Sequence, residues 1–415
     1  MKFLQTGDWH LGKTFFEQPL IDDQQHFLAQ VTEELQRACT AGSPYDALIV
    51  PGDVYDRAVP PPEAVSLLST FLTGTNHAFP RLHIFLLAGN HDSAERLSFA
   101  KDILSAQRIH ICTDCSTFTE PVFVADAEVY QLPFLTPGCI RAGNSGSADL
   151  FQAPLRGQQE LLDAAVEQIV RARGKRAGAA AAPDAGVLDS DTPAVLCAHL
   201  FAAGSRRSES ERIPVGTAEQ VAADSFKGFA YTALGHLHSC QQAGNHVWYS
   251  GAPLCYSFAE SQEDKYMLSV SVSAGSEPDV QKIPVHPLHR CTILKAPFSE
   301  LLSGSAFDHA RDDYVQAVCT DRGAVENPIA RLRQRFPRIL SFTYAQDGAA
   351  GGSSTTLSER RELLAEHSGH SAEDIFRAFH KDIYGGSGTD DAGAALEAET
   401  ALFRSYAARI QGGMQ

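Results

Sequence analysis

Residues 84–92 read IFLLAGNHD, an apolar run that is followed at once by an amide, an imidazole and a carboxylate. A short apolar run bounded by a glycine is typical of a buried strand. Asn and Asp are poorly suited to strands, so we expect this strand to end before Asn90. The stretch predicts a strand that carries Asn90, His91 and Asp92 at its carboxyl end, where open α/β sheets bind their ligands.

The same arrangement recurs along the chain. Polar clusters follow apolar runs at 47–50, 194–198 and 229–234, and one more follows the less apolar run FLQT near the N-terminus. A glycine stands before most of the clusters and permits a tight turn there. The clusters are Asp8 and His10 in GDWH, Asp53 and Asp56 in PGDVYD, His199 in CAHL, and His236 and His238 in GHLH.

Residues 1–285 alternate strand-like runs with helical patterns. This alternation predicts an α/β core whose strands are buried between helices. The segment 22–39 has the periodicity of an amphipathic helix, and a second helix is expected within 61–72. The predicted inner face of the first helix holds Phe27, Val31, Leu35 and Cys39.

The pattern changes near residue 285. Residues 286–346 read as a small α+β domain, and a Gly/Ser-rich linker follows it. Residues 358–415 hold amphipathic helical patterns with too few neighbours to bury their apolar faces. The segment 171–191 is low in complexity and is expected to be a mobile insertion.

Composition narrows the class of protein. The formal net charge of −16 argues against a generic nucleic-acid coat protein, though it permits an enzyme with local basic patches. No apolar run is long enough to span a membrane, and the N-terminus turns polar too early for a signal peptide. The nine scattered cysteines suit free thiols in the cytoplasm. The pair Cys112 and Cys115 lacks a second CxxC, so we read it as two thiols rather than as a zinc site.

Spacing points to a metal centre. Asp8 and His10 stand two positions apart, as do His236 and His238, which in extended backbone places each pair on one face. Asp, Asn and His together suit Mn²⁺, Fe²⁺ or Zn²⁺. The candidate ligands fit two ions roughly 3.5–4 Å apart that share one carboxylate. Single pieces also have plainer readings, such as a helix cap in GNHD, so the prediction rests on the whole series.

The series DxH, GDxxD, GNHD, H and GHxH resembles the motifs of calcineurin-like metallophosphoesterases. The flanking stretches GDWHLGK, GDVYDRAVPP, AGNHDSAERL, ALGHLH and YSGAPLCYSFAE resemble one branch, the SbcD-type nucleases that partner an SbcC-type ATPase in bacterial DNA repair. The resemblance spans roughly residues 1–345. It implies an α/β fold, with a metallophosphoesterase β-sandwich flanked by helices, a small α+β capping domain and a helical C-terminal tail.

The resemblance also implies a role for each motif residue. His91 would bind no metal; it would lie over the scissile phosphate and protonate the leaving oxygen. Asp92 would orient His91 or cap the following helix. Asp56 stands where some archaeal relatives carry a histidine, and we leave it out of catalysis. The implied metal ligands are Asp8, His10 and His238 for one ion, Asn90, His199 and His236 for the second, and Asp53 for both.

The implied activity is that of a metal-dependent DNA nuclease using two divalent ions, expected to be Mn²⁺. It would be a 3′→5′ exonuclease on duplex ends and an endonuclease on hairpins and single strands, by attack of a metal-activated water. The tail helices would bind an SMC-like ATPase of the SbcC type, within a heterotetramer that contains a homodimer of this chain. The candidate docking residues are Leu363, Leu364, Ile375, Phe376, Phe379 and Ile383.

Further surface roles are open to two readings. The helix at 62–72, with Val65, Leu68 and Leu72, could form a homodimer contact or belong to the core. Basic residues near the motifs could contact DNA phosphates or could be merely solvated. These residues are Arg57, Arg206, Arg207 and Arg212.

Two other functions compete with the nuclease. The first is a metallophosphoesterase acting on small molecules or phosphoproteins. Protein phosphatases of this superfamily usually carry GDxxDRG and GNHE, whereas this chain has GDVYDRA and GNHD. The second is a non-enzymatic assembly subunit, which the complete set of candidate ligands disfavours.

Overall fold

The computed structural model describes residues 1–140, 157–176, 192–205, 220–321 and 323–345, together with Thr400 and Phe403. Met1–Tyr344 form one compact unit, and Ala345–Gln415 form a second. In the described ranges, no helix combines the length and the apolar character needed to cross a bilayer. The predicted tail helices lie almost wholly outside the described residues, as do positions 177–191 of the predicted insertion.

Two six-stranded sheets form the centre of the first unit. The first sheet has the order β14-β13-β1-β4-β5-β6 and contains β1 (Lys2–Gln5), β4 (Ala47–Val50), β5 (His83–Leu87), β6 (Ile109–Cys112), β13 (Tyr266–Ser271) and β14 (Asp279–Pro284). The second has the order β11-β12-β10-β9-β8-β7 and contains β7 (Val122–Val124), β8 (Ala127–Leu132), β9 (Ala194–His199), β10 (Tyr231–Gly235), β11 (Gln241–Gly244) and β12 (Val247–Tyr249). Within the sheets, β1, β4, β5 and β6 run parallel, and so do β8, β9, β10 and β12. The sequence-predicted strands therefore belong to a β-sandwich.

Strand β4 shows why these runs are continuously apolar. Its side chains alternate between the two faces of the sheet. Ala47 and Ile49 enter the core between the two sheets, while Leu48 and Val50 enter the core between the first sheet and its helices. Strands that are buried on both faces need apolar residues at every position, which explains the pattern ALIV.

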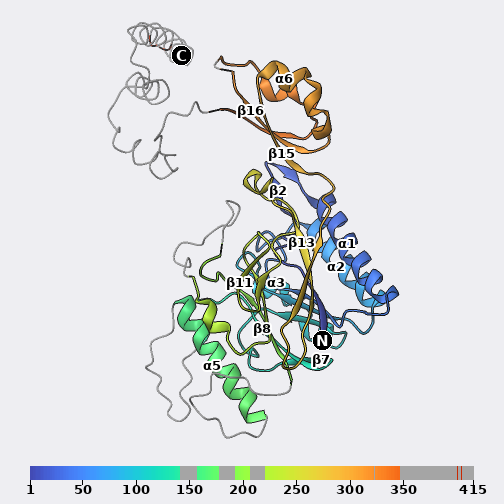
Figure 1. Ribbon diagram of the computed structural model, residues 1–415, viewed down its shortest axis with the longest axis vertical. Coiled ribbons are helices and arrows are strands. Elements are labelled where there is room, and N and C mark those ends of the chain that lie inside the picture. Colours follow the sequence, from blue (N-terminus) through green and yellow to red (C-terminus); the bar gives the residue numbers. More distant parts are fainter. Residues whose placement is uncertain are drawn as a thin grey trace, which may run out of the picture. The chain divides into compact units, whose positions relative to one another are not determined.

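Helices cover the outer face of each sheet. Helices α1 (Ile21–Thr40) and α2 (Pro62–Ala78) pack on the first sheet, and α5 (Gln158–Arg176) packs on the second, as Figure 1 shows. Cys39 is exposed, so its place on the predicted inner face of α1 was wrong, and Ala38 is buried instead. Steps of four residues drift about 40° each around a helix of 3.6 residues per turn, so the buried stripe returns to position 38.

Helix α2 resolves one of the open readings. Leu68 and Leu72 are buried in the core of their own chain together with Phe71, whereas Val65 is exposed. The core reading therefore holds for the two leucines. Only Val65, of the three residues considered, remains available on the outer face of the helix.

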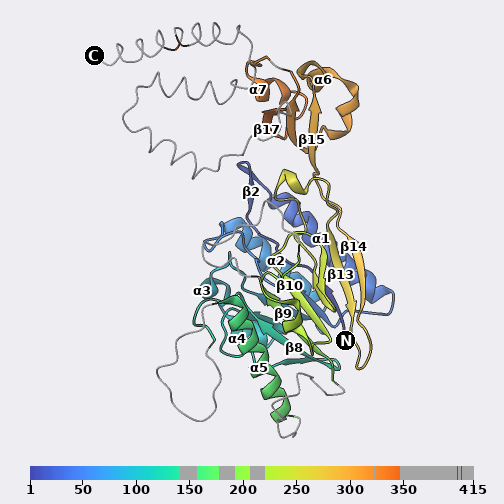
Figure 2. The same ribbon diagram turned by 60° about the vertical axis from the view of Figure 1, so that its left-hand side comes forward.

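Residues 291–344 build a smaller, three-stranded parallel sheet (Figure 2). Its strands are β15 (Cys291–Ala296), β16 (Tyr314–Cys319) and β17 (Ile339–Tyr344), and its helices are α6 (Phe298–Ser303), η3 (Ser305–Ala310) and α7 (Pro328–Leu332). This sheet has a hydrophobic core of its own. A further cluster joins Cys291 and Tyr314 to Phe15, Leu254 and Phe258 of the larger part. The predicted division between 285 and 286 stays a prediction, because both sides belong to one compact unit.

The remaining short elements connect these layers. They are the hairpin of β2 (Thr14–Phe15) and β3 (Gln18–Pro19), the helices α3 (Ala94–Leu97) and α4 (Lys101–Ser105), and the 3-10 helices η1 (Ala223–Phe226) and η2 (Phe258–Glu260).

Candidate metal centre and catalytic site

The predicted site residues follow the carboxyl ends of five strands, and the structure brings them together. Strands β1, β4 and β5 are parallel neighbours in one sheet, and β9 and β10 are parallel neighbours in the other. Parallel neighbours end at the same edge of a sheet, so residues far apart in the sequence meet there. The residues are Asp8 and His10 after β1, Asp53 after β4, Asn90 and His91 after β5, His199 at the end of β9, and His236 and His238 after β10.

One half of the centre contains His10 and His238, whose Nε2 atoms lie 3.2 Å apart. Asp53 Oδ2 lies 3.6 Å from His10 Nε2. Both histidines are almost completely buried. Because two ring nitrogens that face each other cannot both donate, at least one of them presents its lone pair to the space between them.

The other half is organised around Asn90. Its Oδ1 lies 2.9 Å from His199 Nε2 and 3.0 Å from His236 Nδ1. His199 Nδ1 lies 2.9 Å from the carbonyl oxygen of Pro51, which fixes the ring so that Nε2 points into the centre. An amide oxygen and two imidazole nitrogens thus converge from both sheets.

Asp53 lies between the two halves. Its Oδ2 is 3.6 Å from His199 Nε2 as well as 3.6 Å from His10 Nε2. Asp8 contacts the strand ends of the second sheet, because its Oδ1 accepts the backbone N–H of His236 and lies 4.0 Å from His199 Nδ1. Asp8, Asp53 and His199 form one group of candidate ligands whose atoms lie within 4.8 Å of one another.

Strained backbone is concentrated in this centre. Asp8, His10, Asp53 and His236 have φ values of 52°, 45°, 49° and 107°, in the left-handed region that non-glycine residues rarely adopt. Such a residue costs of order 1–3 kcal/mol and persists only where its surroundings enforce it. This backbone strain is a structural sign of a functional site. The sequence predicted the site but not the strain.

Two glycines make room for the ligands. A Cβ atom on Gly89 would lie 2.1 Å from Asp53 Oδ1 and 2.4 Å from its backbone nitrogen. A Cβ on Gly52 would lie 2.1 Å from His199 Nδ1. Neither position tolerates a side chain, so the glycines that precede the motifs are needed for close approach as well as for turning.

Burial sets the charge state of the centre. It lowers the pKa of His10 well below its ordinary value, with a further contribution from His238. It also lowers the pKa of His199, and that of His236 to about 3. Burial alone would raise the pKa of Asp53, but the neighbouring histidines, His199 foremost, bring it below its ordinary value. The centre therefore presents neutral imidazoles and an ionised carboxylate.

These donors fit divalent metal ions. Metal ligands must be deprotonated, and neutral imidazole nitrogens with carboxylate and amide oxygens are the ligands of borderline-hard cations. Within the described ranges, the buried Nδ1 of His10 has no hydrogen-bond partner, and Asp56 Oδ1 lies 3.6 Å from it. Unsatisfied polar atoms are costly in an interior, and a bound cation would remove that cost.

His91 lies beside the centre and is partly exposed. Its backbone N–H donates to Asp53 Oδ1 at 3.0 Å, and its Nδ1 lies 2.8 Å from the carbonyl oxygen of Asp56. Its ring centroid is 4.7 Å from that of His10. With Nδ1 tied to the backbone, Nε2 is the nitrogen available for proton transfer.

Asp92 does not have the role expected from the sequence. Its carboxylate accepts the backbone N–H groups of Gly89, Val54 and Tyr55, at 2.9, 3.1 and 2.9 Å. The helix cap is supplied by Ser93, whose side chain accepts from the N–H of Arg96. Asp92 instead ties the loop after β5 to the loop after β4, which holds both motifs in register.

Asp56, which the sequence interpretation left out of catalysis, lies at the site. Its Oδ1 forms an ion pair with Lys13 Nζ at 2.7 Å. His10, Asp56 and His91 form the second group of candidate ligands. The sequence signal was present in GDVYD, where Asp56 stands three positions after Asp53.

The weaker predictions divide by location. Arg57 is exposed and lies 3.9 Å from Asp56. Arg206, Arg207 and Arg212 lie outside the described residues, as do all six candidate docking residues of the tail. Cys112 and Cys115 have free thiols and belong to no candidate metal group in the part of the chain that the structure describes.

Comparison with known proteins agrees with this geometry. Residues 1–160 match the family model for calcineurin-like phosphoesterases. The chain is 25% identical over 346 residues to the D subunit of the nuclease SbcCD from Staphylococcus epidermidis (strain ATCC 12228 / FDA PCI 1200), covering 83% of this chain and 85% of that protein. It also aligns with the crystal structure of a Staphylococcus aureus protein provisionally named a 5′-nucleotidase, solved with alpha-ketoglutarate. That alignment has 15% identity and a TM-score of 0.35 and covers 81% of this chain but 58% of the other, so it supports no conclusion.

Proposed function

We propose that the chain is a calcineurin-like phosphoesterase of the SbcD type, a phosphodiester hydrolase that uses divalent metal ions, and that it is the nuclease subunit of an SbcCD-type complex. One observation carries the proposal. Asp53 Oδ2 lies 3.6 Å from ring nitrogens that come from opposite sheets, with His91 directly beside it. This is the arrangement that two cations sharing one carboxylate require.

The residues divide into two metal sites. In this proposal Asp53 contributes to both, and the ions are Mn²⁺, which Asp, Asn and His ligands accept. When bound, two such cations neutralise the phosphate oxygens and lower the pKa of a bound water. The proposed ligands are Asp8, His10 and His238 for one ion, and Asn90, His199 and His236 for the other.

His91 supplies the proton of the reaction in this proposal. The oxygen of water adds to phosphorus and releases one of its protons to solvent, while the bond from phosphorus to the leaving oxygen breaks. The proton on Nε2 of His91 passes to that leaving oxygen, and solvent returns a proton to His91 afterwards. The carbonyl of Asp56 holds Nδ1, so the ring presents Nε2 in a constant direction. The partial exposure of His91 allows a phosphodiester to reach it.

The substrate and partner belong to the same proposal. DNA as substrate and an SMC-like ATPase as partner are supported by the relative named as part of SbcCD and by the motif stretches that resemble that branch. We propose 3′→5′ exonuclease action on duplex ends and endonuclease action on hairpins and single strands. Binding of the ATPase through the tail helices, a homodimer within a heterotetramer, and a cytoplasmic location remain predictions.

A nuclease assay tests the function. The full-length chain is incubated with end-labelled duplex and hairpin DNA in Mn²⁺, Mg²⁺ or EDTA, with and without the partner ATPase. We expect Mn²⁺-dependent shortening of the DNA that falls by at least about 10²-fold in His91→Ala, the loss typical of removing a general acid. The His91→Ala variant should still bind Mn²⁺, because His91 is not a proposed ligand.

Two controls sharpen the result. His77→Ala changes an exposed histidine of α2 and should leave the rate unchanged. A small diester dye substrate is tested alongside the DNA. Hydrolysis of the dye with DNA left intact, even when the ATPase is present, would contradict the nuclease proposal and favour a small-molecule phosphodiesterase.

A further inference from the structure

A pair of buried opposite charges lies directly behind the proposed metal centre. Glu260, the last residue of η2, has no exposed surface, and its Oε2 accepts a hydrogen bond from Lys265 Nζ at 2.5 Å. Lys265 is itself only 7% exposed. Removing two charges from water is costly, and a well-packed apolar pair is often at least as stable. A contribution to stability therefore does not explain why this pair is charged.

The pair contacts His238 at two points. Lys265 Nζ donates to the backbone carbonyl of His238 at 3.2 Å, and Glu260 Oε1 lies 3.7 Å from His238 Nδ1. The other ring nitrogen, Nε2, faces the centre. A carboxylate at Nδ1 keeps the proton on that nitrogen, which leaves the lone pair of Nε2 directed at the place where a cation would bind.

The contact between Glu260 Oε1 and His238 Nδ1, at 3.7 Å, exceeds the upper limit of an ordinary N–H···O hydrogen bond by about 0.5 Å. Hydrogen bonds in functional sites are often long before the site is loaded and shorten afterwards. The ring of His238 is buried, and Tyr256 packs against it with a centroid distance of 5.6 Å. Burial and this ring contact therefore restrict the orientation of the His238 side chain.

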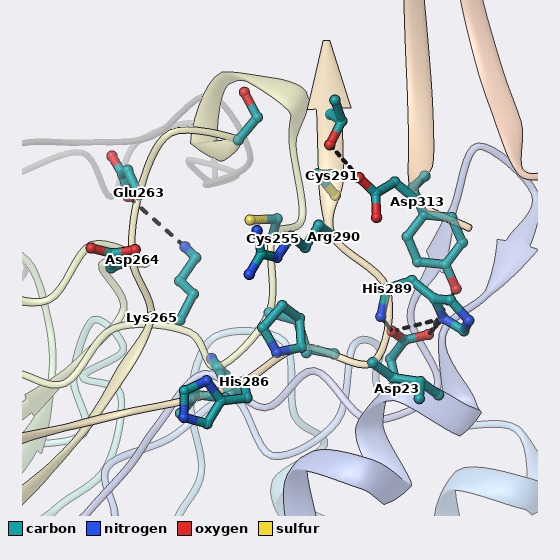
Figure 3. Close-up of a pocket in the computed structure, with 18 of the residues that line it drawn as sticks. Asp23, Cys255, Glu263, Asp264, Lys265, His286, His289, Arg290, Cys291 and Asp313 are labelled. Atoms are coloured by element: carbon teal, nitrogen blue, oxygen red, sulfur yellow. Dashed lines mark hydrogen bonds and ion pairs between the residues drawn. The ribbon is translucent and has the colours of Figure 1, made fainter. Parts of the chain in front are cut away.

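Lys265 has a second acidic neighbour, Glu263. Glu263 Oε2 lies 3.9 Å from Lys265 Nζ, and its side chain is 40% exposed. Figure 3 shows Lys265 and Glu263 joined along the wall of a cavity of about 840 Å³, which Asp264 and Cys255 also line. Glu260 is fully buried, does not line that cavity and contacts His238. The chain thus offers two glutamates beside one lysine, of which only one contacts a proposed ligand.

We propose that Glu260 is a positioning residue of the metal centre. Through His238 Nδ1 it holds the imidazole in the orientation and tautomer that bind a divalent cation, and Lys265 holds Glu260 in place. The inference rests on the proposed function, which counts His238 among the metal ligands. It also assigns a role to the stretch YSFAE (256–260), which resembles the SbcD branch but carries none of the proposed ligands.

Calorimetric titration of Mn²⁺ into the metal-free, full-length protein tests the proposal. The wild type should bind two ions. Glu260→Gln removes the charge at Nδ1, and the double variant Glu260→Met with Lys265→Met removes both charges together. In both variants we expect the affinity for one of the two Mn²⁺ ions to fall by roughly 10–100-fold, the range for losing a partner of a ligating histidine. The affinity for the other ion should stay unchanged.

Glu263→Gln is the matched control, since it removes a carboxylate that lies beside the same lysine and whose Oε2 accepts from the hydroxyl of Ser239, which is not a proposed ligand. Its Mn²⁺ affinities should stay within about twofold of wild type, a much smaller change than the loss of a ligand's partner. Circular dichroism checks that each variant is folded. If Glu260→Gln fails to fold, the double variant carries the test, because it leaves no buried charge alone.

The outcomes separate positioning from mere charge balance. If Glu260 only neutralises Lys265, the double variant will recover wild-type affinity for both ions, and the proposal is then overturned. Unchanged Mn²⁺ binding in a folded Glu260→Gln variant would overturn it as well. Failure of the wild type to bind Mn²⁺ would instead refute the metal centre of the proposed function, and this inference with it.

Discussion

At the scale of single residues, Asp53 illustrates how this centre is held. Its φ of 49° is unfavourable for an aspartate, yet the residue is fixed from several sides. Its carbonyl accepts the N–H of His10 at 2.9 Å, and its Oδ1 accepts the N–H of His91 at 3.0 Å. The proposed bridging position of Asp53 therefore depends on the hydrogen bonds that it accepts from His10 and His91.

Gly89, which packs against Asp53, gives a prediction at this scale. Gly89→Ala would place a Cβ within 2.1 Å of Asp53 Oδ1, so the loop must shift. We expect a loss of about 1–3 kcal/mol in the free energy of unfolding, as for overpacked sites, and weaker Mn²⁺ binding. Urea unfolding and metal titration measure the two effects.

The control for this prediction is Gly74→Ala in helix α2. Nothing lies within 4 Å of a Cβ placed there. Alanine is the better helix former, so this variant should gain about 0.5–1 kcal/mol and bind metal normally. Equal effects of the two substitutions would contradict the close packing at Gly89.

At the scale of secondary-structure elements, β5 and β6 carry a partly buried histidine pair. His83 Nδ1 lies 3.0 Å from His110 Nε2, and the His110 ring stacks on Phe85 at 4.8 Å. Burial, with a smaller contribution from His83, lowers the pKa of His110 to about 4. The two imidazoles that contact each other across β5 and β6 therefore stay neutral at physiological pH.

This pair predicts a dependence of stability on pH. Because the folded-state pKa of His110 lies below its ordinary value of 6.5, the unfolded chain binds the proton more readily between about pH 6.5 and 4. Stability should fall as the pH is lowered through that range. His110→Gln should reduce the slope of the unfolding free energy against pH by the equivalent of up to about one bound proton. Urea unfolding of the metal-free protein at several pH values measures this slope.

An exposed histidine provides the comparison. His77→Gln, on α2, should keep the slope of the wild type, because this exposed side chain is not buried by folding. If the slope with His110→Gln equals that of the wild type, the partly buried pair does not contribute to acid sensitivity.

At the scale of the whole molecule, Asp23 of α1 joins the small three-stranded sheet to the sandwich. Its carboxylate accepts the backbone N–H of His289 at 3.1 Å and the hydroxyl of Tyr314 at 2.7 Å. The His289 ring lies 3.1 Å from the same carboxylate. One buried aspartate therefore ties residues on both sides of the predicted boundary at 285/286.

Asp23→Asn should loosen this junction. An amide cannot accept all three contacts, and a buried donor left without its partner costs about 1–3 kcal/mol. We expect faster hydrogen exchange at the amide of His289 and nearby residues, measured by mass spectrometry, with little change in the strands of the sandwich. Asp22→Asn changes the exposed neighbour and should leave the exchange as in the wild type. Equal protection in both variants would show that the hydrophobic cluster alone holds the junction.

Much of this molecule was readable from the sequence because the relevant physics is local. Apolar runs such as 84–87 predict buried strands, and the polar residues after them mark strand ends. The order of the motifs indicated a dimetal phosphoesterase, and the structure brings all seven proposed ligands and His91 to one place. Periodicity misjudged the end of the stripe on α1, where Cys39 is exposed.

Other features depended on long-range contacts that no local pattern encodes. The division into two sheets, the position of Asp53 between histidines from both, and the left-handed backbone at the ligands arise only when distant strands pack together. The same holds for Asp92, which ties two loops instead of capping a helix, and for Glu260 and Lys265, which meet behind His238. A sequence can specify which groups stand at strand ends, whereas the partners of a buried polar group are chosen by the tertiary fold that excludes water from them.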